Sequence, residues 1–153
     1  MDIEEQYDKI YRYCYFKLYD RHLAQDVTQE TFLRFYRRDL CLSRDGELPY
    51  LYTTAKNLCV DMLRKSPLSS LEDMDAEPAY DPSENWVDRL ALRSLLAKLP
   101  PQEQELLFLR YANELPFASI CQITGLSRFA IHRRLSKALK WLREELKKEG
   151  FSQ

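Results

Sequence analysis

No stretch of this 153-residue sequence alternates apolar and polar residues over a useful length, which is the pattern of a half-buried β-strand. Apolar residues instead recur every three or four positions, and Leu, Arg, Lys, Glu and Ala, which favour helices, are plentiful. Only three glycines occur, and the 45% of residues that are apolar can fill one core or two small ones. We therefore predict an all-α fold, with two small helical domains joined by a linker.

The first domain is expected at residues 1–65. Helical periodicity predicts helices at about 4–18, 21–38 and 49–65, with Pro49 in the favourable first turn of the third helix and a loop over 39–49. Residues 66–85 hold three prolines and six acidic residues with no basic one. This composition predicts an acidic, flexible linker, which we place at 66–88.

The second domain is expected at residues 89–149. A helix carrying Leu92, Leu95, Leu96 and Leu99 should end at Pro100–Pro101, and another should restart at the sequence QEQELLFLRYA. A short helix at about 116–124 and a long helix at about 128–148 follow, separated by Gly125, Leu126 and Ser127. With Ser127 as the N-cap of the long helix, this arrangement predicts a helix-turn-helix.

The long final helix has an apolar side and a basic side. Ile131, Leu135, Ala138 and Leu142 fall within one narrow arc, which predicts the buried side. From Ser127 to Lys148 there are eight basic residues and two acidic ones, a net charge of +6, although the whole chain has a formal net charge of −1. Basic side chains near the start of such a helix can reach phosphates or guanine edges in a DNA major groove.

Two further helix faces carry patterns that suggest binding. On the third helix, with Leu51, Ala55, Leu58 and Met62 on the buried side, the opposite side combines an aromatic residue, cations and an amide, which suit single-stranded nucleic acid: Tyr50, Lys56, Asn57, Asp61 and Arg64. On the second helix Ala24, Val27, Thr28, Thr31, Phe32 and Phe35 should face the core. The other side is polar with one leucine, and it could be solvated or dock another helix: Asp26, Gln29, Glu30, Leu33 and Arg37.

The cysteines and the termini add expectations about cofactors and location. Cys14, Cys41, Cys59 and Cys121 are scattered singly, and neither histidine lies near them in sequence, so we expect reduced thiols in or near helical cores, no metal site and no cofactor. No segment approaches the roughly 20 apolar residues of a membrane span, and the N-terminus is acidic. We expect a cytoplasmic protein without direct membrane insertion.

Three sequence segments, taken in order, resemble the bacterial sigma-70 family, and specifically its small extracytoplasmic-function (ECF) type. DVTQETFLRFYRR (26–38) resembles the helix of that family that binds core RNA polymerase, and LPYLYTTAKNLCVDMLRK (48–65) resembles its −10-element helix. Residues 96–146 resemble its −35-element domain, although Phe129 stands where the family commonly has a small residue. The resemblance covers nearly the whole chain.

The resemblance implies a sigma factor that binds core RNA polymerase, directs it to promoters and assists their opening, with no catalysis of its own. Its partners would be the beta and beta-prime subunits of the polymerase, promoter DNA, and an anti-sigma factor as a candidate inhibitor. Three sets of site residues follow from it. The polymerase would contact Asp26, Gln29, Glu30 and Leu33. The opened −10 element would be met by Tyr50, Lys56, Asn57, Asp61 and Arg64, with the 39–49 loop helping to hold a flipped-out base. The −35 element would be met by Arg128, Phe129, His132, Arg133, Lys137 and Lys140.

Two alternatives belong to other classes of protein. A free-standing helix-turn-helix transcriptional regulator would explain residues 96–146 but would give no role to the faces on the second and third helices. A DNA recombinase would need a βαβ pattern, a glycine-rich loop or clustered catalytic carboxylates, and residues 1–65 lack these.

Overall fold

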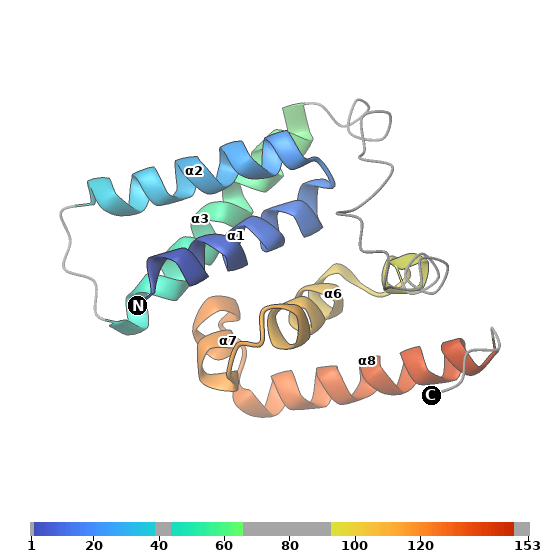
Figure 1. Ribbon diagram of the computed structural model, residues 1–153. Helices are drawn as coiled ribbons and strands as arrows, with labels where there is room; N and C mark the ends of the chain where they lie inside the picture. Colours follow the sequence, from blue (N-terminus) through green and yellow to red (C-terminus); the bar gives the residue numbers. More distant parts are fainter. Residues whose placement is uncertain (1, 39–43, 66–92, 149–153) are drawn as a thin grey trace. The chain divides into compact units, whose positions relative to one another are not determined.

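The computed structural model describes residues 2–38, 44–65 and 93–148, and every regular element in these ranges is a helix, as predicted (Figure 1). The chain divides into two compact units. The first contains α1, α2 and α3, and the second contains α6, η1, α8 and residues 117–121 of α7. The predicted linker at 66–88 lies outside the described residues.

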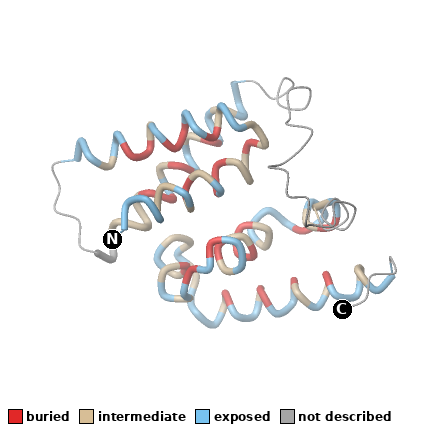
Figure 2. The backbone as a smooth tube through the Cα atoms, viewed as in Figure 1, coloured by how far each residue is buried: buried red, intermediate tan, exposed pale blue. Residues whose placement is uncertain are grey.

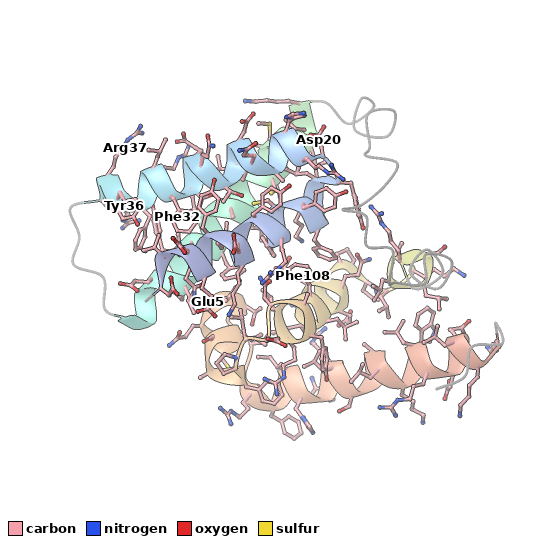
Figure 3. The ribbon with its side chains drawn as sticks, in the orientation of Figure 1. Glu5, Asp20, Phe32, Tyr36, Arg37 and Phe108 are labelled. Atoms are coloured by element: carbon pink, nitrogen blue, oxygen red, sulfur yellow. The ribbon has the colours of Figure 1, made fainter. Side chains whose placement is uncertain are left out.

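The first unit is a three-helix arrangement in which each helix packs against the other two: α1 (Ile3–Leu18), α2 (Arg21–Arg37) and α3 (Arg44–Lys65). Aspartates cap the first two helices. Asp2 accepts hydrogen bonds from the backbone amides of Glu4 and Glu5, and Asp20, between α1 and α2, accepts one from Leu23 at 3.0 Å (Figure 3). These side chains satisfy amides that have no partner within the helix, which explains where the two helices begin.

Aromatic side chains join the three helices of the first unit. The rings of Tyr7 on α1 and Phe32 on α2 have centroids 5.3 Å apart, and those of Tyr13 on α1 and Tyr52 on α3 are 5.2 Å apart, edge to face. Ile10, which lies between Tyr7 and Tyr13 in the sequence of α1, is fully buried. Large rings cover much apolar surface, so a short three-helix unit can be stabilised by few residues.

Buried threonine and cysteine side chains in this core have hydrogen-bond partners close by. The hydroxyls of Thr28 and Thr31 donate hydrogen bonds of 2.6 and 2.7 Å to the carbonyls of Ala24 and Val27, one turn earlier on α2. Cys14 and Cys59 are buried as thiols, which hydrogen-bond to each other between α1 and α3. The expected position of the thiols in or near helical cores therefore fits these two cysteines and the half-buried Cys121, whereas Cys41 lies outside the described residues.

The start of α3 differs from the prediction. The helix begins at Arg44, so the predicted loop over 39–49 is wrong for residues 44–49, and residues 39–43 lie outside the described part. Pro49 lies inside the helix, where its missing N–H removes one hydrogen bond to the carbonyl four residues earlier. The loss is confined to the start of the helix, and packing of the following turns, which include the buried Leu51 and Tyr52, offsets it.

The buried side of α3 is also displaced from the predicted stripe. Leu51 and Ala55 are buried as expected, but Leu58 and Met62 are only half-buried. Tyr52 and Cys59 are buried in addition, because α3 contacts α1 through the Tyr13 ring and the Cys14 thiol. On α2 the predicted core residues are buried except Phe35, which is half-buried.

The first described element of the second unit is a helical turn at 93–96. The helix predicted up to the two prolines therefore stops before Leu99, and Leu92 lies outside the described residues. The elements after this turn are α6 (Pro101–Leu107), η1 (Phe108–Ala112), α7 (Phe117–Thr124) and α8 (Arg128–Lys148). The sequence predicted one continuous α-helix through QEQELLFLRYA, but its second half is a π-helix. The amide of Asn113 bonds the carbonyl of Phe108, five residues earlier, at 3.0 Å.

Helix α8 packs on α6 along its apolar side. The predicted stripe is confirmed, since Ile131, Leu135, Ala138 and Leu142 are the buried residues of α8 and recur along one side of it (Figure 2). A salt bridge of 2.8 Å between Arg134 and Glu103 links α8 to α6 beside this stripe. In the described part of the chain, no helix combines the length and the apolar character needed to cross a bilayer.

Candidate nucleic-acid interface

The turn between α7 and α8 has the two features that the sequence predicted. Gly125 adopts a left-handed conformation with φ of 77°, which costs glycine little, and its amide bonds the carbonyl of Cys121 at 2.8 Å to end α7. Ser127 then caps α8, because its hydroxyl oxygen accepts a hydrogen bond of 3.1 Å from the amide of Ala130. The pair is a helix-turn-helix, and this turn sets the direction in which α8 leaves.

Outside its buried stripe, α8 has an exposed surface rich in basic residues, which we call the α8 basic face. All six predicted residues on it are exposed: Arg128, Phe129, His132, Arg133, Lys137 and Lys140. Five carry or can carry positive charge, so the face suits a polyanion. The charge segregation read from the sequence is therefore present on the folded helix.

The ring of Phe117 on α7 contacts residues at the start of this face. The guanidinium groups of Arg110 and Arg128 lie 4.6 and 5.8 Å from the centroid of the Phe117 ring, and the His132 ring lies 6.2 Å from it, edge to face. Arg110 also donates a hydrogen bond of 3.0 Å to the carbonyl of Leu115. Phe117 thus connects η1, α7 and the first turns of α8 and restricts where Arg128 and His132 can point.

No sequence pattern indicated Arg110 or Phe117 as functional residues. Arg110 lies seven residues before Phe117 on another element, so no single helical period relates them. The available signal was an aromatic residue directly after Pro116, at the expected start of a helix.

The exposed side of α3, which we call the α3 mixed face, contains four of the five predicted residues in exposed positions: Lys56, Asn57, Asp61 and Arg64. Asn57, Asp61 and Arg64 are spaced four and three residues apart, so they share one side of the helix. Tyr50 differs, because it is half-buried, with its ring 6.0 Å from Phe35 and 4.3 Å from the guanidinium of Arg38. It is held against the end of α2, two turns before Asn57.

The α2 polar face comprises Asp26, Gln29, Glu30 and Leu33. Asp26, Gln29 and Leu33 are exposed, and Glu30 is half-buried and pairs with Arg34 at 2.9 Å. Leu33 is 49% exposed, and Tyr36, one turn further on, is 61% exposed. Tyr36 and Arg37 lie at the C-terminal end of α2 (Figure 3). Tyr36 was not among the predicted residues, although its spacing of three from Leu33 places it on this face.

Comparison with known protein families assigns both units. The model of sigma-70 region 2 matches residues 3–67, and the model of sigma-70 region 4 matches residues 89–142. The two regions occur in order and together span most of the sequence. The chain belongs to the sigma-70 family, ECF type. The region 2 match contains the α2 polar face and the α3 mixed face, and the region 4 match contains the α8 basic face.

Individual relatives of this sigma-70 family chain support the ECF type. The ECF RNA polymerase sigma factor BldN of Streptomyces coelicolor is 32% identical over 149 residues, which cover 90% of this chain and 56% of the relative. The ECF RNA polymerase sigma factor SigE of Mycolicibacterium smegmatis is 28% identical, with 97% of this chain and 61% of the relative covered. SigM of Bacillus subtilis is 27% identical, with 83% and 84% covered. The chain thus spans less than two thirds of the first two relatives.

The family assignment decides between the classes that the sequence left open. The resemblance to the ECF type is confirmed, and so is the all-α fold with one region 2 part and one region 4 part. A free-standing helix-turn-helix regulator is not favoured, because that function would not account for the match to region 2 at residues 3–67.

Proposed function

We propose that this chain is an RNA polymerase sigma factor that binds core polymerase, directs it to promoters through −10 and −35 elements, and assists promoter opening. The observation that carries the proposal is the ordered match of both sigma-70 regions, each with an exposed helix face of suitable chemistry. In this proposal residues 1–65 bind polymerase and the −10 element, residues 66–88 form the linker, and residues 89–149 bind the −35 element. The protein acts in the cytoplasm, where the polymerase is.

The test is reconstitution with purified core polymerase. The chain should form a holoenzyme that starts transcription at defined sites on fragments of the source genome, whereas core polymerase alone should not. A chain that binds short duplexes tightly by itself and ignores the core would instead be a free-standing regulator.

The partners follow from the faces. The α2 polar face would contact the clamp helices of the beta-prime subunit, and further polymerase contacts would involve the beta subunit. An anti-sigma factor that covers these surfaces is a further candidate partner. Purification of the tagged chain from the source cell, followed by mass spectrometry, would reveal either partner.

The α3 mixed face is assigned to the opened −10 strand, with Asn57 as its central residue. Its amide can donate and accept hydrogen bonds to an unpaired base edge, and Lys56 and Arg64 supply positive charge for the backbone. We expect Asn57→Ala to reduce open-complex formation about 5- to 10-fold, as one lost hydrogen bond of ~1 kcal/mol or slightly more implies, while core binding stays unchanged. Permanganate footprinting of unpaired thymines measures the opening.

A template with a pre-melted −10 bubble separates two roles for Asn57. If the defect disappears on this template, the residue assists opening, and if it persists, the residue captures the strand. An undiminished permanganate signal on both templates would remove Asn57 from the site.

The α8 basic face is assigned to the −35 element, with different roles along its length. Arg133 lies near the start of α8, where a side chain can reach a base edge, and Lys140 lies two turns later, where a phosphate is the expected partner. We expect Arg133→Ala to weaken binding to the −35 element by about 1–3 kcal/mol and to relax the base preference at one base pair. Lys140→Ala should weaken binding to all −35 sequences alike. It should also reduce the slope of the logarithm of the binding constant against the logarithm of salt concentration by about one unit.

Holoenzymes carrying each variant are compared on a library randomised across the −35 element. The two substitutions each remove one positive charge, so they control for one another. The placement of α8 is wrong if Lys140→Ala changes the preferred base while Arg133→Ala lowers every sequence equally.

A further inference from the structure

Phe129 is the most exposed of the large apolar side chains in the described part of the chain, at 73%. It is the second residue of α8 and lies on the α8 basic face, away from the buried stripe that begins at Ile131. Exposure of a large ring to water is unfavourable. The ring contributes little to the core of the unit and is accessible to a partner of this surface.

Phe129 does not stand alone on that surface. The guanidinium of Arg133, one turn later, lies 5.6 Å from the centroid of the Phe129 ring, a cation–π contact. The contact restricts both side chains to the same part of the face. Arg128 and His132 are exposed on the same face, so the ring belongs to a surface whose other groups attract a phosphate backbone.

The chemistry of a phenyl ring limits what it can recognise in a major groove. Phenylalanine has no group that donates or accepts a hydrogen bond, so it cannot distinguish base edges by their hydrogen-bonding pattern. The apolar group that the groove presents is the C5-methyl of thymine. A ring at the start of the recognition helix would bury this methyl and gain affinity from its removal from water.

The spacing of the pair then sets the spacing of the bases. Four residues of α-helix advance about 6 Å, which corresponds to one or two base-pair steps of about 3.4 Å. Arg133 is suited to guanine through two parallel hydrogen bonds. A thymine and a guanine within two steps of one another would therefore be read together.

From these observations we infer that Phe129 is a specificity-determining residue that contacts a thymine methyl group in the −35 element, and that its contact with Arg133 couples this readout to a nearby guanine. The inference rests on the proposed function. It adds a contact of a different chemical kind to the hydrogen bonds and phosphate contacts of the α8 basic face.

The experiment removes the methyl group without changing base pairing. The preferred −35 sequence is first selected from a randomised library with the reconstituted holoenzyme, and each thymine on either strand is then replaced in turn by deoxyuridine. We expect wild-type holoenzyme to bind about 4-fold more weakly at one position, as loss of one buried methyl implies. Phe129→Ala holoenzyme should bind the thymine and deoxyuridine duplexes equally.

Two further variants complete the design. Tyr111→Ala removes another exposed aromatic ring of the same unit, 54% exposed, and should keep the full 4-fold effect of deoxyuridine. Arg133→Ala should lose its preference for a guanine within two base pairs of the sensitive thymine. Because Phe129 and Tyr111 are exposed, both alanine variants should fold, which circular dichroism checks.

The inference is overturned if no single thymine shows the effect, if the selected element contains no thymine, or if Phe129→Ala loses as much affinity on deoxyuridine as wild type does. It is also overturned if Phe129→Ala weakens core binding but leaves promoter binding unchanged, since the ring would then face a protein. Failure of the proposed function looks different, because no holoenzyme would then start at any promoter.

Discussion

Replacement of Asp26, Gln29 and Glu30 by alanine is expected to weaken binding of core RNA polymerase on the order of 100-fold, taking about 1 kcal/mol for each of three polar contacts. The three residues lie on one side of α2 next to Leu33, which is 49% exposed. A leucine surrounded by polar groups is typical of the centre and rim of a protein interface. Truncation leaves the leucine in place but removes the groups that would pair with the partner. Titration of the labelled chain with core polymerase, followed by fluorescence anisotropy, measures the change.

The matched control for this variant is Glu4→Ala with Asp8→Ala on α1. Both positions are exposed, and the pair removes two acidic groups, as the α2 variant does. Non-specific charge effects should therefore be equal in the two proteins. Glu30 pairs with Arg34, so the α2 variant also releases one exposed salt bridge, which is worth little. Circular dichroism should show unchanged helicity in both proteins, and the α2 assignment is refuted if they bind the core equally well.

Ile131→Ala is expected to lower the free energy of unfolding of the second unit by about 2–5 kcal/mol. Ile131 is fully buried and is the first residue of the stripe through which α8 packs on α6. Alanine would leave a cavity at the point where the helix-turn-helix is attached to the rest of the unit. The start of α8 would then be held by the Phe117 cluster and the Arg134–Glu103 salt bridge, and −35 binding should fall as well.

Hydrogen exchange of backbone amides in the full chain measures this effect unit by unit. Amides of α6 and α8 should exchange faster in Ile131→Ala, while those of α1, α2 and α3 should not change. Lys137→Ala serves as the control, because an exposed substitution on the same helix usually changes stability by less than about 0.5 kcal/mol. Equal protection in both variants would show that Ile131 does not hold α8 in place.

Local chemistry explains why much of the second unit could be predicted from the sequence. Gly125, Ser127 and the spacing of Ile131, Leu135, Ala138 and Leu142 act over one to four residues, and the structure has the predicted turn, cap and buried stripe. The same holds for the exposed positions of the α8 basic face, because a residue opposite a buried stripe must face outward. Their roles in DNA binding stay predictions.

Interactions between distant residues explain where prediction failed. Pro49 is a good start signal in isolation, yet α3 begins at Arg44, because the packing of the later turns outweighs the loss of one hydrogen bond. Leu58 is half-buried and Cys59 is buried, because α3 packs against Tyr13 and Cys14 of α1. A helical wheel of α3 alone does not include these two residues of α1.

By itself the sequence determined that the chain is helical, where α7 ends and α8 begins, and which sides of α2 and α8 are polar, since each depends on residues within about one turn of one another. Only the tertiary structure decided that Phe117 contacts Arg110, Arg128 and His132. The same is true of the contacts of Tyr50 with Phe35 and Arg38, and of the salt bridge between Arg134 and Glu103. Most of these contacts join different helices, and their geometry depends on how whole elements pack rather than on the spacing within any one of them.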